Sequence, residues 1–385
     1  MDLSDARIRC ESGFAERFGL DAVHTASAPG RLEVLGNHTD YNLGLTLSCA
    51  IDLRCYASSA ALDIPEVHLS STAIDAAPEV YPFDRLTAPA GHWANYVLGL
   101  IASLRQHNDV LPGLAIHFDS QVPGSAGLSS SSALEMSALT AMARLIGLEL
   151  SPLEMATIGQ RVESDVVGAQ TGLLDQLTSL PGKHGHLLRI DFKTLQTQQI
   201  RMPAGWCFVA VDTGVKHDLT QEYNQRRASC EQAAAAMGVA SLRDVTQDLL
   251  SQHRAAMPDD VWRCARHVIA ETGRVRLAHT SLLQGEVEAL GRLMFESHDS
   301  SRRDFCNSCV ELDAFVEHAQ QDNRCIGARL SGGGFGGMTI HLLREEDAQS
   351  YLDDLLDKFK TKGVPERWAR VCRIDDGARI ESQRL

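Results

Sequence analysis

The sequence predicts an α+β protein with two domains. Segments with strand-like composition and segments with helical periodicity fall into separate runs, instead of alternating strictly as they do around a parallel sheet. The length of 385 residues is sufficient for two domains with substantial cores. Hydrophobic residues make up 44% of the chain and charged residues 22%, which is typical of a globular protein and not of a disordered one.

The first half of the chain mixes strands and helices. Residues 28–56 are rich in strand formers and are interrupted by a polar loop at 36–42, and residues 114–118 alternate as a strand. A glycine–serine loop at 123–132 leads into a helix that is expected to run to about residue 146. The segment Ser151 to Glu154 has the pattern of a capping box with proline at the first helical position. Leucines at 173, 174, 177 and 180 predict a short amphipathic helix.

A polar, weakly patterned stretch at 194–205 is the best candidate boundary between the domains. We therefore expect one domain over 1–200 and a second over 201–385, and leave open a return of the last strand to the first domain. The second half is expected to contain a strand at 206–211, helices at about 218–237, 259–272 and 275–297, and strands at 327–330 and 338–343 on either side of a glycine-rich loop. This order suggests a split β-α-β unit.

The charge balance and the N-terminus exclude several classes of protein. The net charge is −14, so long-range attraction to nucleic acid or to anionic lipid is not expected. The first 20 residues lack an apolar signal-peptide core, and no apolar run is long enough to cross a membrane. The ten cysteines are scattered, as reduced thiols of a cytoplasmic protein would be. The single C-x-x-C pair, Cys306 and Cys309, lacks the second ligand pair of a zinc site.

Three loops carry residues suited to chemistry. The segment GSAGLSSSS at 124–132 opens into a helix, where backbone N–H groups and the helix dipole favour an anion, although a serine-capped helix explains it equally well. The segment GGGFGG at 332–337 implies a close neighbour, either chain or ligand, or else a tight hairpin. The loop at 36–42 holds Asn37, His38, Asp40 and Asn42, which suit sugar hydroxyls but also suit an ordinary turn.

Together these loops resemble the three signatures of the GHMP kinases, and the first is specifically similar to galactokinase. The first signature matches GRLEVLGNHTDYNLG at 30–44, the second matches PGSAGLSSSSA at 123–133, and the third matches RLSGGGFGG at 329–337. Between them, GLLDQ at 172–176 resembles the catalytic G-I-M-D-Q of that family, and HDLTQEYNQRR at 217–227 resembles its H-S-L-x-x-S-x-Y-x-x-R-R segment. The resemblance covers residues 28–337 in the order of the family.

This resemblance implies a ribosomal-S5-like N-terminal domain, a ferredoxin-like C-terminal domain, and an active site between them that uses ATP and Mg²⁺. Asp175 would take the proton of the C1 hydroxyl of the sugar, and Arg31 would hold that carboxylate ionised and stabilise the transferring phosphoryl group. Ser131 and Glu163 match the magnesium ligands. The implied sugar contacts are Asn37, His38, Asp40, Gly172 and Tyr223. The implied ATP contacts are Gly124, Ser125, Ala126, Gly127, Leu128, Ser129, Ser130, Ser131, Trp93 and Tyr96, of which the two aromatic residues suit core packing as well.

The chain departs from the galactokinase pattern at two positions of the first signature. Asn37 stands where galactokinases usually have a glutamate that resembles a partner of the sugar's C6 hydroxyl, and Glu33 stands where they usually have an asparagine. The expected function is therefore an ATP-dependent sugar 1-kinase with galactose as the leading substrate. The alternatives are a kinase for a C6-altered galactose such as galacturonate, and a non-catalytic sensor of galactose and ATP. The expected partners are the sugar and ATP alone, with no nucleic acid and no membrane. The sequence leaves the oligomeric state open, and a monomer is our expectation.

Overall fold

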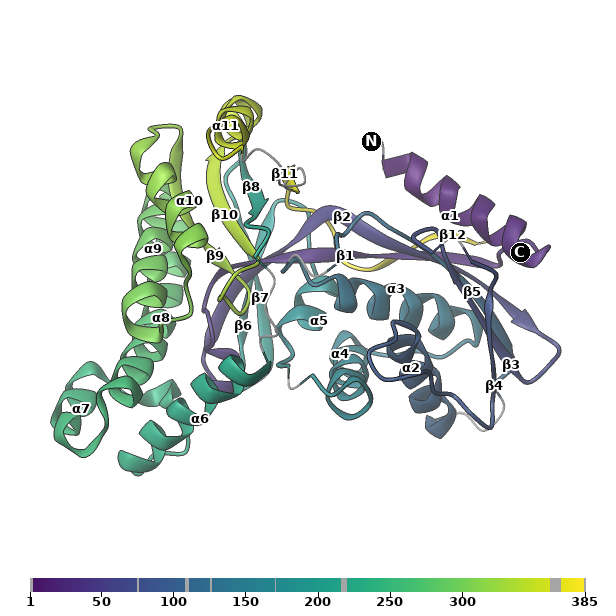
Figure 1. The fold of residues 1–385 in the computed structure, drawn as a ribbon, viewed down its shortest axis with the longest axis horizontal. Helices are drawn as coiled ribbons and strands as arrows, with labels where there is room; N and C mark the ends of the chain where they lie inside the picture. The colour runs from purple at the N-terminus through teal and green to yellow at the C-terminus, as the bar shows by residue number, and fades with distance from the viewer. Residues whose placement is uncertain are drawn as a thin grey trace.

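The fold was determined as a computed structural model, which describes residues 3–74, 76–107, 111–124, 127–169, 171–215, 220–360 and 368–383. Within these residues the chain forms two β-sheets, each covered by its own helices (Figure 1). The predicted α+β class is confirmed.

The larger sheet has eight strands in the described part of the chain, and its longest strands cross the middle of the molecule. The order β12-β1-β2-β5-β3-β4 forms the main path, and β6 joins it by pairing with β2 and with β7. The bounds of these strands are β1 His24–Leu35, β2 Leu45–Leu62, β3 Glu66–Ser71, β4 Glu79–Pro82, β5 Gly113–Ser120, β6 His186–Asp191, β7 Gln196–Arg201 and β12 Arg379–Gln383. Every residue of β1 is buried, because β1 lies between β2 and β12 and under helices.

Helices cover both faces of this sheet. Helix α1 (Leu3–Phe18) contacts β2 and β5 from one side, whereas α2 (Ala94–His107), α3 (Ser130–Leu145), α4 (Pro152–Val162) and α5 (Leu174–Ser179) lie on the other (Figure 1). Helix α4 begins at the predicted capping box, in which Ser151 accepts the N–H of Glu154 and the Glu154 carboxylate accepts the N–H of Ser151. A π-helical turn, Glu163–Val167, follows α4 directly. Helices α3 and α5 contact β1, and α4 contacts both of these helices.

The smaller sheet has the order β11-β8-β10-β9, with all neighbours antiparallel. Its strands are β8 Trp206–Asp212, β9 Cys325–Ser331, β10 Met338–Arg344 and β11 Ala369–Cys372. The helices of this half are α6 Thr220–Ala236, α7 Gln247–Gln252, α8 Asp259–Leu283, α9 Val287–Ser300, α10 Val310–Gln321 and α11 Glu345–Lys358. Helices α9 and α10 pack against β9, and α11 packs against β8 and β11.

One helical prediction of the second half is wrong. Two helices were expected at 259–272 and 275–297, but α8 continues unbroken to residue 283 and α9 begins at 287. Gly273 lies inside α8, where glycine costs about 1 kcal/mol relative to alanine. The buried residues Thr272, Val275 and Ala278 keep the helix packed across that position. The actual break follows Gly285, which has a φ of +79°.

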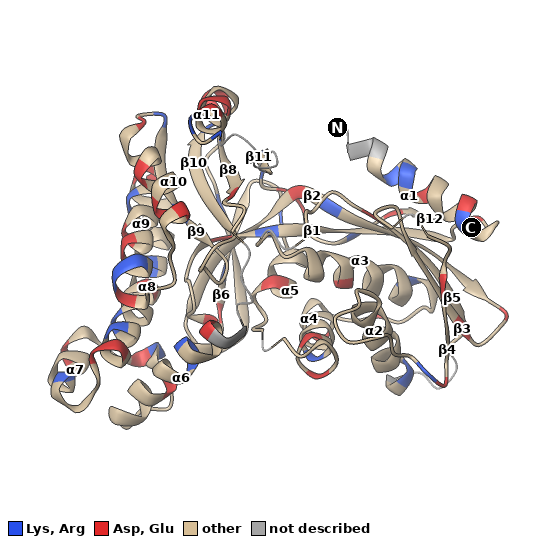
Figure 2. Ribbon diagram, in the orientation of Figure 1, with Lys and Arg blue, Asp and Glu red and all other residues tan. Residues whose placement is uncertain are grey.

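The last strand, β12, pairs antiparallel with β1, so the chain ends in the larger sheet. The domain boundary at 200/201 stays a prediction. Acidic and basic residues are interspersed along the outer helices α8, α9 and α10, whereas the central strands are largely uncharged (Figure 2). Among the described residues, no helix combines the length and the apolar character that a membrane crossing requires.

Candidate active site

A cavity of about 240 Å³ lies between β1 of the larger sheet and the loop that joins β9 to β10. It is lined by Arg31, Glu33, Asn37, His38, Asp40, Thr171, Gly172, Leu174, Asp175, Tyr223, Gly332 and Gly333. All seven residues predicted to act on the sugar or on its proton therefore surround one space. These residues come from three stretches of the chain, 31–40, 172–175 and the start of α6 at Tyr223, and the fold brings them together.

The centre of this site is an ion pair between Arg31 on β1 and Asp175 in the first turn of α5. Arg31 Nη2 lies 2.8 Å from Asp175 Oδ1, and Nε donates to the same oxygen at 2.9 Å. The hydroxyl of Ser129 donates to the other oxygen, Oδ2. The Asp175 side chain is 25% exposed, so a ligand can reach a carboxylate whose orientation is already fixed by its partners. This arrangement suits a group that accepts a proton.

The serine-rich loop is attached to the same arginine. Arg31 Nη1 donates to the carbonyl oxygen of Gly127 at 2.7 Å, and the Arg31 N–H donates to Leu128 O at 3.1 Å. Ser129 is left-handed, with a φ of +61°, and α3 begins at the next residue. The predicted ATP contacts at Gly124 and at 127–131 thus lie before and within the first turn of α3, while Ser125 and Ala126 lie outside the described residues.

The two predicted magnesium ligands touch each other. Ser131 Oγ donates to Glu163 Oε1 at 2.9 Å, and Thr171 Oγ1 donates to Oε2 of the same carboxylate. Burial, and then the nearby charge of Asp175, raise the pKa of Glu163, whereas the hydrogen bonds from Thr171 and Ser131 act in the opposite direction. A hydroxyl and a carboxylate at the start of a helix fit Mg²⁺, which is commonly bound by one or two protein oxygens together with phosphate oxygens.

A further carboxyl group, Glu135, adjoins this pair and was missed by sequence reasoning. It is fully buried in α3 and accepts a hydrogen bond from Gln176 Nε2 at 3.3 Å. Burial and then the charge of Glu163 raise the pKa of Glu135 well above its usual range, which favours the neutral form of this carboxyl group.

The loop after β1 is held by contacts within itself and with the loop between β9 and β10. His38 Nε2 donates to the carbonyl oxygen of Gly333 at 3.0 Å, and its Nδ1 lies 3.0 Å from the Tyr41 hydroxyl. Burial lowers the pKa of His38 to about 4, which leaves the imidazole neutral at pH 7. Its ring packs against Tyr223 and Phe305, with centroids 5.0 and 4.5 Å away. His38 can thus shape the cavity wall without adding charge to it.

Asp40 projects toward Gly172 on the opposite side of the cavity. A Cβ atom added at Gly172 would collide with Asp40 Oδ2, so a larger residue there would displace this carboxylate. Burial raises the pKa of Asp40 to about 6, with smaller contributions from the charges of Glu33 and Asp175. The carboxylate is therefore mostly ionised at pH 7 but is easily protonated in mild acid.

The change Gly172→Ala should lower kcat/KM for the sugar by roughly 10- to 100-fold, because a displacement of about 1 Å in a binding group can cost that much. The loss should appear mainly in KM, since Asp40 moves while Asp175 keeps its partners. Gly273→Ala is the matched control, because an added Cβ at that helical position meets no atom within 4 Å. Equal kinetics in the two variants would show that Asp40 tolerates the displacement.

The second glycine loop does have a close neighbour, and it is a segment of the chain. A Cβ atom at Gly334, whose φ is +83°, would collide with the carbonyl oxygen of Asn307. The carbonyl oxygens of Gly332 and Gly333 accept hydrogen bonds from Asn37 and His38. This loop therefore presents acceptors to the first loop and closes the cavity from the side of the smaller sheet.

Trp93 and Tyr96 do not line this cavity. Trp93 donates to Glu79 Oε1 at 3.2 Å and packs edge-on against Phe118 at 5.9 Å. The Tyr96 pKa is raised by burial and then by the charge of Glu163, which places Tyr96 near the serine-rich loop side of the site. Their contact with the adenine stays a prediction.

Helix α8 contributes two residues that no sequence pattern indicated. Glu271 Oε1 accepts the backbone N–H groups of Gly36 at 2.9 Å and of Asn37 at 3.3 Å. His267 Nε2 donates to the carbonyl oxygen of Asn37 at 3.2 Å. Both side chains are fully buried. They lie about 230 positions along the chain from the loop that they hold.

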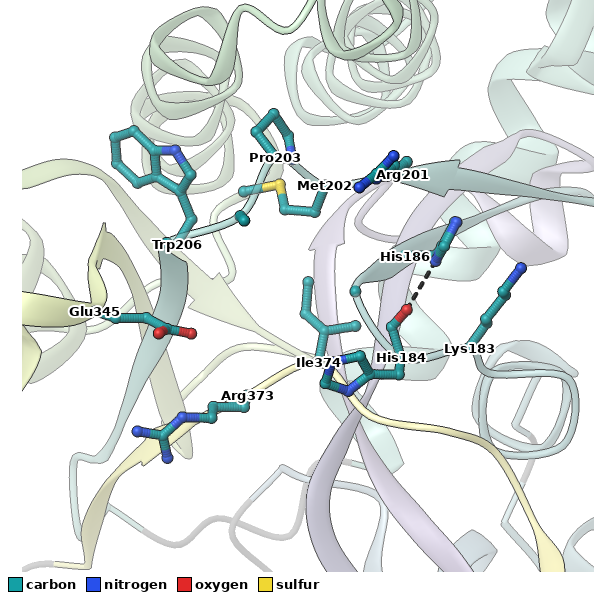
Figure 3. A pocket seen from close by; sticks show the side chains of 13 residues that line it. Lys183, His184, His186, Arg201, Met202, Pro203, Trp206, Glu345, Arg373 and Ile374 are labelled. Atoms are coloured by element: carbon teal, nitrogen blue, oxygen red, sulfur yellow. Dashed lines mark hydrogen bonds between the residues drawn. The ribbon is translucent and has the colours of Figure 1, made fainter.

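A larger cavity, of about 620 Å³, lies where the chain passes from β7 to β8 and from β11 toward β12 (Figure 3). Lys183, His184, His186, Arg201 and Arg373 give its lining a basic character, together with the apolar side chains of Met202, Trp206 and Ile374. None of the predicted site residues lines this cavity. The smaller cavity is the candidate active site because it holds the ion pair and the loops.

Family models match three parts of the chain. The galactokinase galactose-binding signature matches residues 12–60, the N-terminal domain of GHMP kinases matches residues 95–183, and the GHMP kinase C-terminal domain matches residues 278–361. These ranges contain the loop after β1, the serine-rich loop with Asp175, and the glycine loop of β9 and β10.

Solved structures of several kinases match nearly the whole of this chain. The galactokinase of Lactococcus lactis, solved with galactose, is 26% identical with a TM-score of 0.90, and the match covers 96% of this chain and 98% of that one. The mevalonate kinase of Methanococcus jannaschii is 19% identical with a TM-score of 0.66, covering 92% and 99%. A D-glycero-D-manno-heptose 1-phosphate kinase of Bacteroides thetaiotaomicron is 15% identical with a TM-score of 0.63, covering 94% and 99%. The last two show similarity of fold.

Proposed function

The chain belongs to the GHMP kinase family, and we propose that it is a galactokinase-type enzyme, which transfers the γ-phosphoryl group of ATP to the C1 hydroxyl of galactose. The observation that carries the proposal is the position of the Arg31–Asp175 pair. It joins the serine-rich loop, through Gly127 and Ser129, to the cavity that suits a sugar.

The chemistry requires a base at the sugar hydroxyl and positive charge at the phosphoryl group. Asp175 accepts the proton of the hydroxyl as the oxygen attacks the γ-phosphorus. Arg31 keeps the carboxylate oriented and stabilises the negative charge on the transferring group, a task to which a guanidinium is suited. His38, Asp40, Gly172 and Tyr223 hold the sugar so that the reacting oxygen lies near Asp175.

The nucleotide is bound at the start of α3. Backbone N–H groups of the serine-rich loop and the positive end of the helix dipole bind its phosphates. Ser131 and Glu163 are the residues that hold Mg²⁺, which supplies charge neutralisation to the phosphates when it is bound. A monomeric enzyme in the cytoplasm remains our prediction from the sequence.

An ADP-release assay on galactose, galacturonate, glucose, fucose and N-acetylgalactosamine tests the proposal. We expect turnover on galactose, with the new phosphate located at C1 by NMR. Turnover on galacturonate alone would support a kinase for a C6-altered sugar. Binding of galactose and ATP without turnover on any of the sugars would support a sensor. The Arg31–Asp175 pair favours the enzyme over the sensor, because a sensor needs no base at the hydroxyl.

Sugar binding should weaken in mild acid. If the Asp40 carboxylate accepts a sugar hydroxyl, its protonation below a pKa of about 6 removes that acceptor, so the Kd for galactose should rise as the pH falls through this value. Calorimetric titration without ATP avoids any contribution from the phosphates. The histidine in the cavity wall stays neutral over the range, since the pKa of His38 is about 4. A Kd that does not change between about pH 5 and 8, or a Kd in the Asp40→Asn variant that keeps the full pH dependence, would contradict this assignment.

A further inference from the structure

The two positions at which the chain departs from the galactokinase pattern are in direct contact. Asn37 Nδ2 donates to Glu33 Oε1 at 2.9 Å, and to the carbonyl oxygen of Gly332 at 2.8 Å. Both side chains line the candidate active site. An asparagine and a glutamate are therefore paired at this point of the cavity wall, in the reverse of the order that the galactokinase pattern has.

The hydrogen-bonding capacity of Asn37 is largely used within the protein. A carboxylate and a carbonyl oxygen can only accept, so the amide nitrogen must face Glu33 and Gly332, and both of its protons are taken. The amide oxygen accepts from Asn307 Nδ2 at 2.9 Å. Asn37 is 1% exposed. It is thus a poor donor to a sugar and a good support for its neighbour.

The hydrogen-bonding capacity of Glu33, in contrast, is only partly used by the residues that the structure describes. Its Oε1 is occupied, because it receives Asn37 and also lies 3.3 Å from Nη1 of the fully buried Arg329. Its Oε2 receives no hydrogen bond from the residues that the structure describes. Glu33 lines the cavity and its side chain is 5% exposed, so a carboxylate held at one oxygen keeps the capacity of its second oxygen to accept a hydrogen bond from a ligand.

The charge of Glu33 acts across the cavity. It contributes to the raised pKa of Asp40, after burial, and to that of Tyr223, after burial and Asp40. Among the described residues, the charged side chains that line the cavity are the cation Arg31 and the acids Glu33, Asp40 and Asp175. Arg31 is already paired with Asp175. A carboxylate on the sugar would therefore meet Glu33 and Asp40, and no described cation that lines the cavity is free to compensate it.

We propose that Glu33 selects the substrate: its Oε2 accepts a hydrogen bond from a sugar hydroxyl other than the reacting one, and Asn37, held by Asn307 and Gly332, positions it. The exchange of glutamate and asparagine makes the C6 hydroxyl the expected partner. The site thereby selects neutral sugars with a free C6 hydroxyl and rejects sugars with a C6 carboxylate. This inference rests on the proposed sugar kinase function.

The test compares Glu33→Gln with the wild type on galactose and on 6-deoxygalactose. Removing one side of a charged hydrogen bond should lower kcat/KM for galactose about 10- to 100-fold. On 6-deoxygalactose, where the hydroxyl is absent, the two proteins should agree within about threefold, because the substitution then removes no bond to the sugar. Glu33→Gln should also raise the rate on galacturonate relative to galactose. An equal loss on both neutral sugars would overturn the proposal.

The exchanged variant, Glu33→Asn with Asn37→Glu, tests the pairing and keeps one carboxylate should Glu33→Gln fail to fold. It should prefer galactose over 6-deoxygalactose as the wild type does, an outcome that a purely structural role would not require. A folded exchanged variant without this preference would overturn the proposal. Failure of the proposed function is distinguishable, since the wild type would then phosphorylate neither sugar.

Discussion

Replacing Asp175 with asparagine should lower kcat by roughly 10²- to 10⁴-fold, the range typical of a positioned acid–base group. Asparagine keeps the size of the side chain and can still accept a hydrogen bond from Arg31, so the geometry of the site is retained. What it loses is the capacity to take the proton of the hydroxyl. KM for galactose should change little, because the side chains proposed to hold the sugar, His38, Asp40 and Tyr223, are unchanged. The measurement is steady-state ADP release with saturating ATP.

Asp165→Asn is the matched control for Asp175→Asn. Asp165 is an exposed aspartate of the π-helical turn after α4, and it does not line the cavity. Its loss removes one negative charge from the same region without touching the ion pair. Wild-type turnover in Asp175→Asn would exclude the carboxylate from the mechanism. A comparable loss in both variants would indicate a general effect of charge.

The parts of the fold that were predictable are those with a local physical cause. The capping box at Ser151 and Glu154 fixes the start of α4 through two hydrogen bonds within four residues, and the sequence shows both partners. The break between α8 and α9 has no such local signal at the right place. The predicted break falls at Gly273, but the burial of the surrounding residues in the folded protein outweighs the cost of one glycine.

The residues of the candidate site likewise include some that a local motif predicts and some whose contacts arise only in the folded chain. The serine-rich loop and Asp175 lie in short motifs, and the structure brings them together with Arg31 at hydrogen-bonding distance. The contacts of Asn37, in contrast, could not be predicted from the motif that contains it. Its partners Glu33, Asn307 and Gly332 span the chain, and only the docking of the smaller sheet on β1 places them around one amide group.

Glu271 and His267 were beyond sequence reasoning for a physical reason. Each is one polar residue on the buried side of a long helix, a position where hydrophobic periodicity predicts core packing. Their role arises because the loop after β1 exposes backbone groups that need partners once water is excluded. A helix from the other half of the chain supplies those partners, and no local sequence pattern in α8 indicates that its residues have this role.

Replacing Glu271 with alanine should lower the free energy of unfolding by about 3–5 kcal/mol, the cost of breaking a buried ion pair by removing one partner. Glu271 is fully buried and pairs with Arg274 at 2.6 Å, and Ser297 Oγ donates to it at 2.7 Å. Its loss leaves the N–H groups of Gly36 and Asn37 without an acceptor. Urea unfolding should show a lower midpoint with an unchanged m-value.

The pH dependence of stability gives a second measurement on the same residue. Burial by itself would raise the pKa of Glu271, but Arg274, Arg329 and His267 hold it well below its ordinary value of 4.5. Because the pKa is depressed in the folded state, the stabilisation is fully present above the unfolded pKa and is lost as the pH falls below it. The Glu271→Ala variant should lack this part of the acid sensitivity of the wild type.

Glu288→Ala, at an exposed glutamate in the first turn of α9, is the control and should unfold with the wild type. Sugar affinity must fall together with stability in Glu271→Ala, because the N–H groups that Glu271 holds belong to the loop that carries Asn37, His38 and Asp40. A variant that loses stability and yet binds galactose as tightly as the wild type would mean that the loop is held by its other contacts, His267 to Asn37 and His38 to Gly333. In that case α8 would support the fold but would not shape the site.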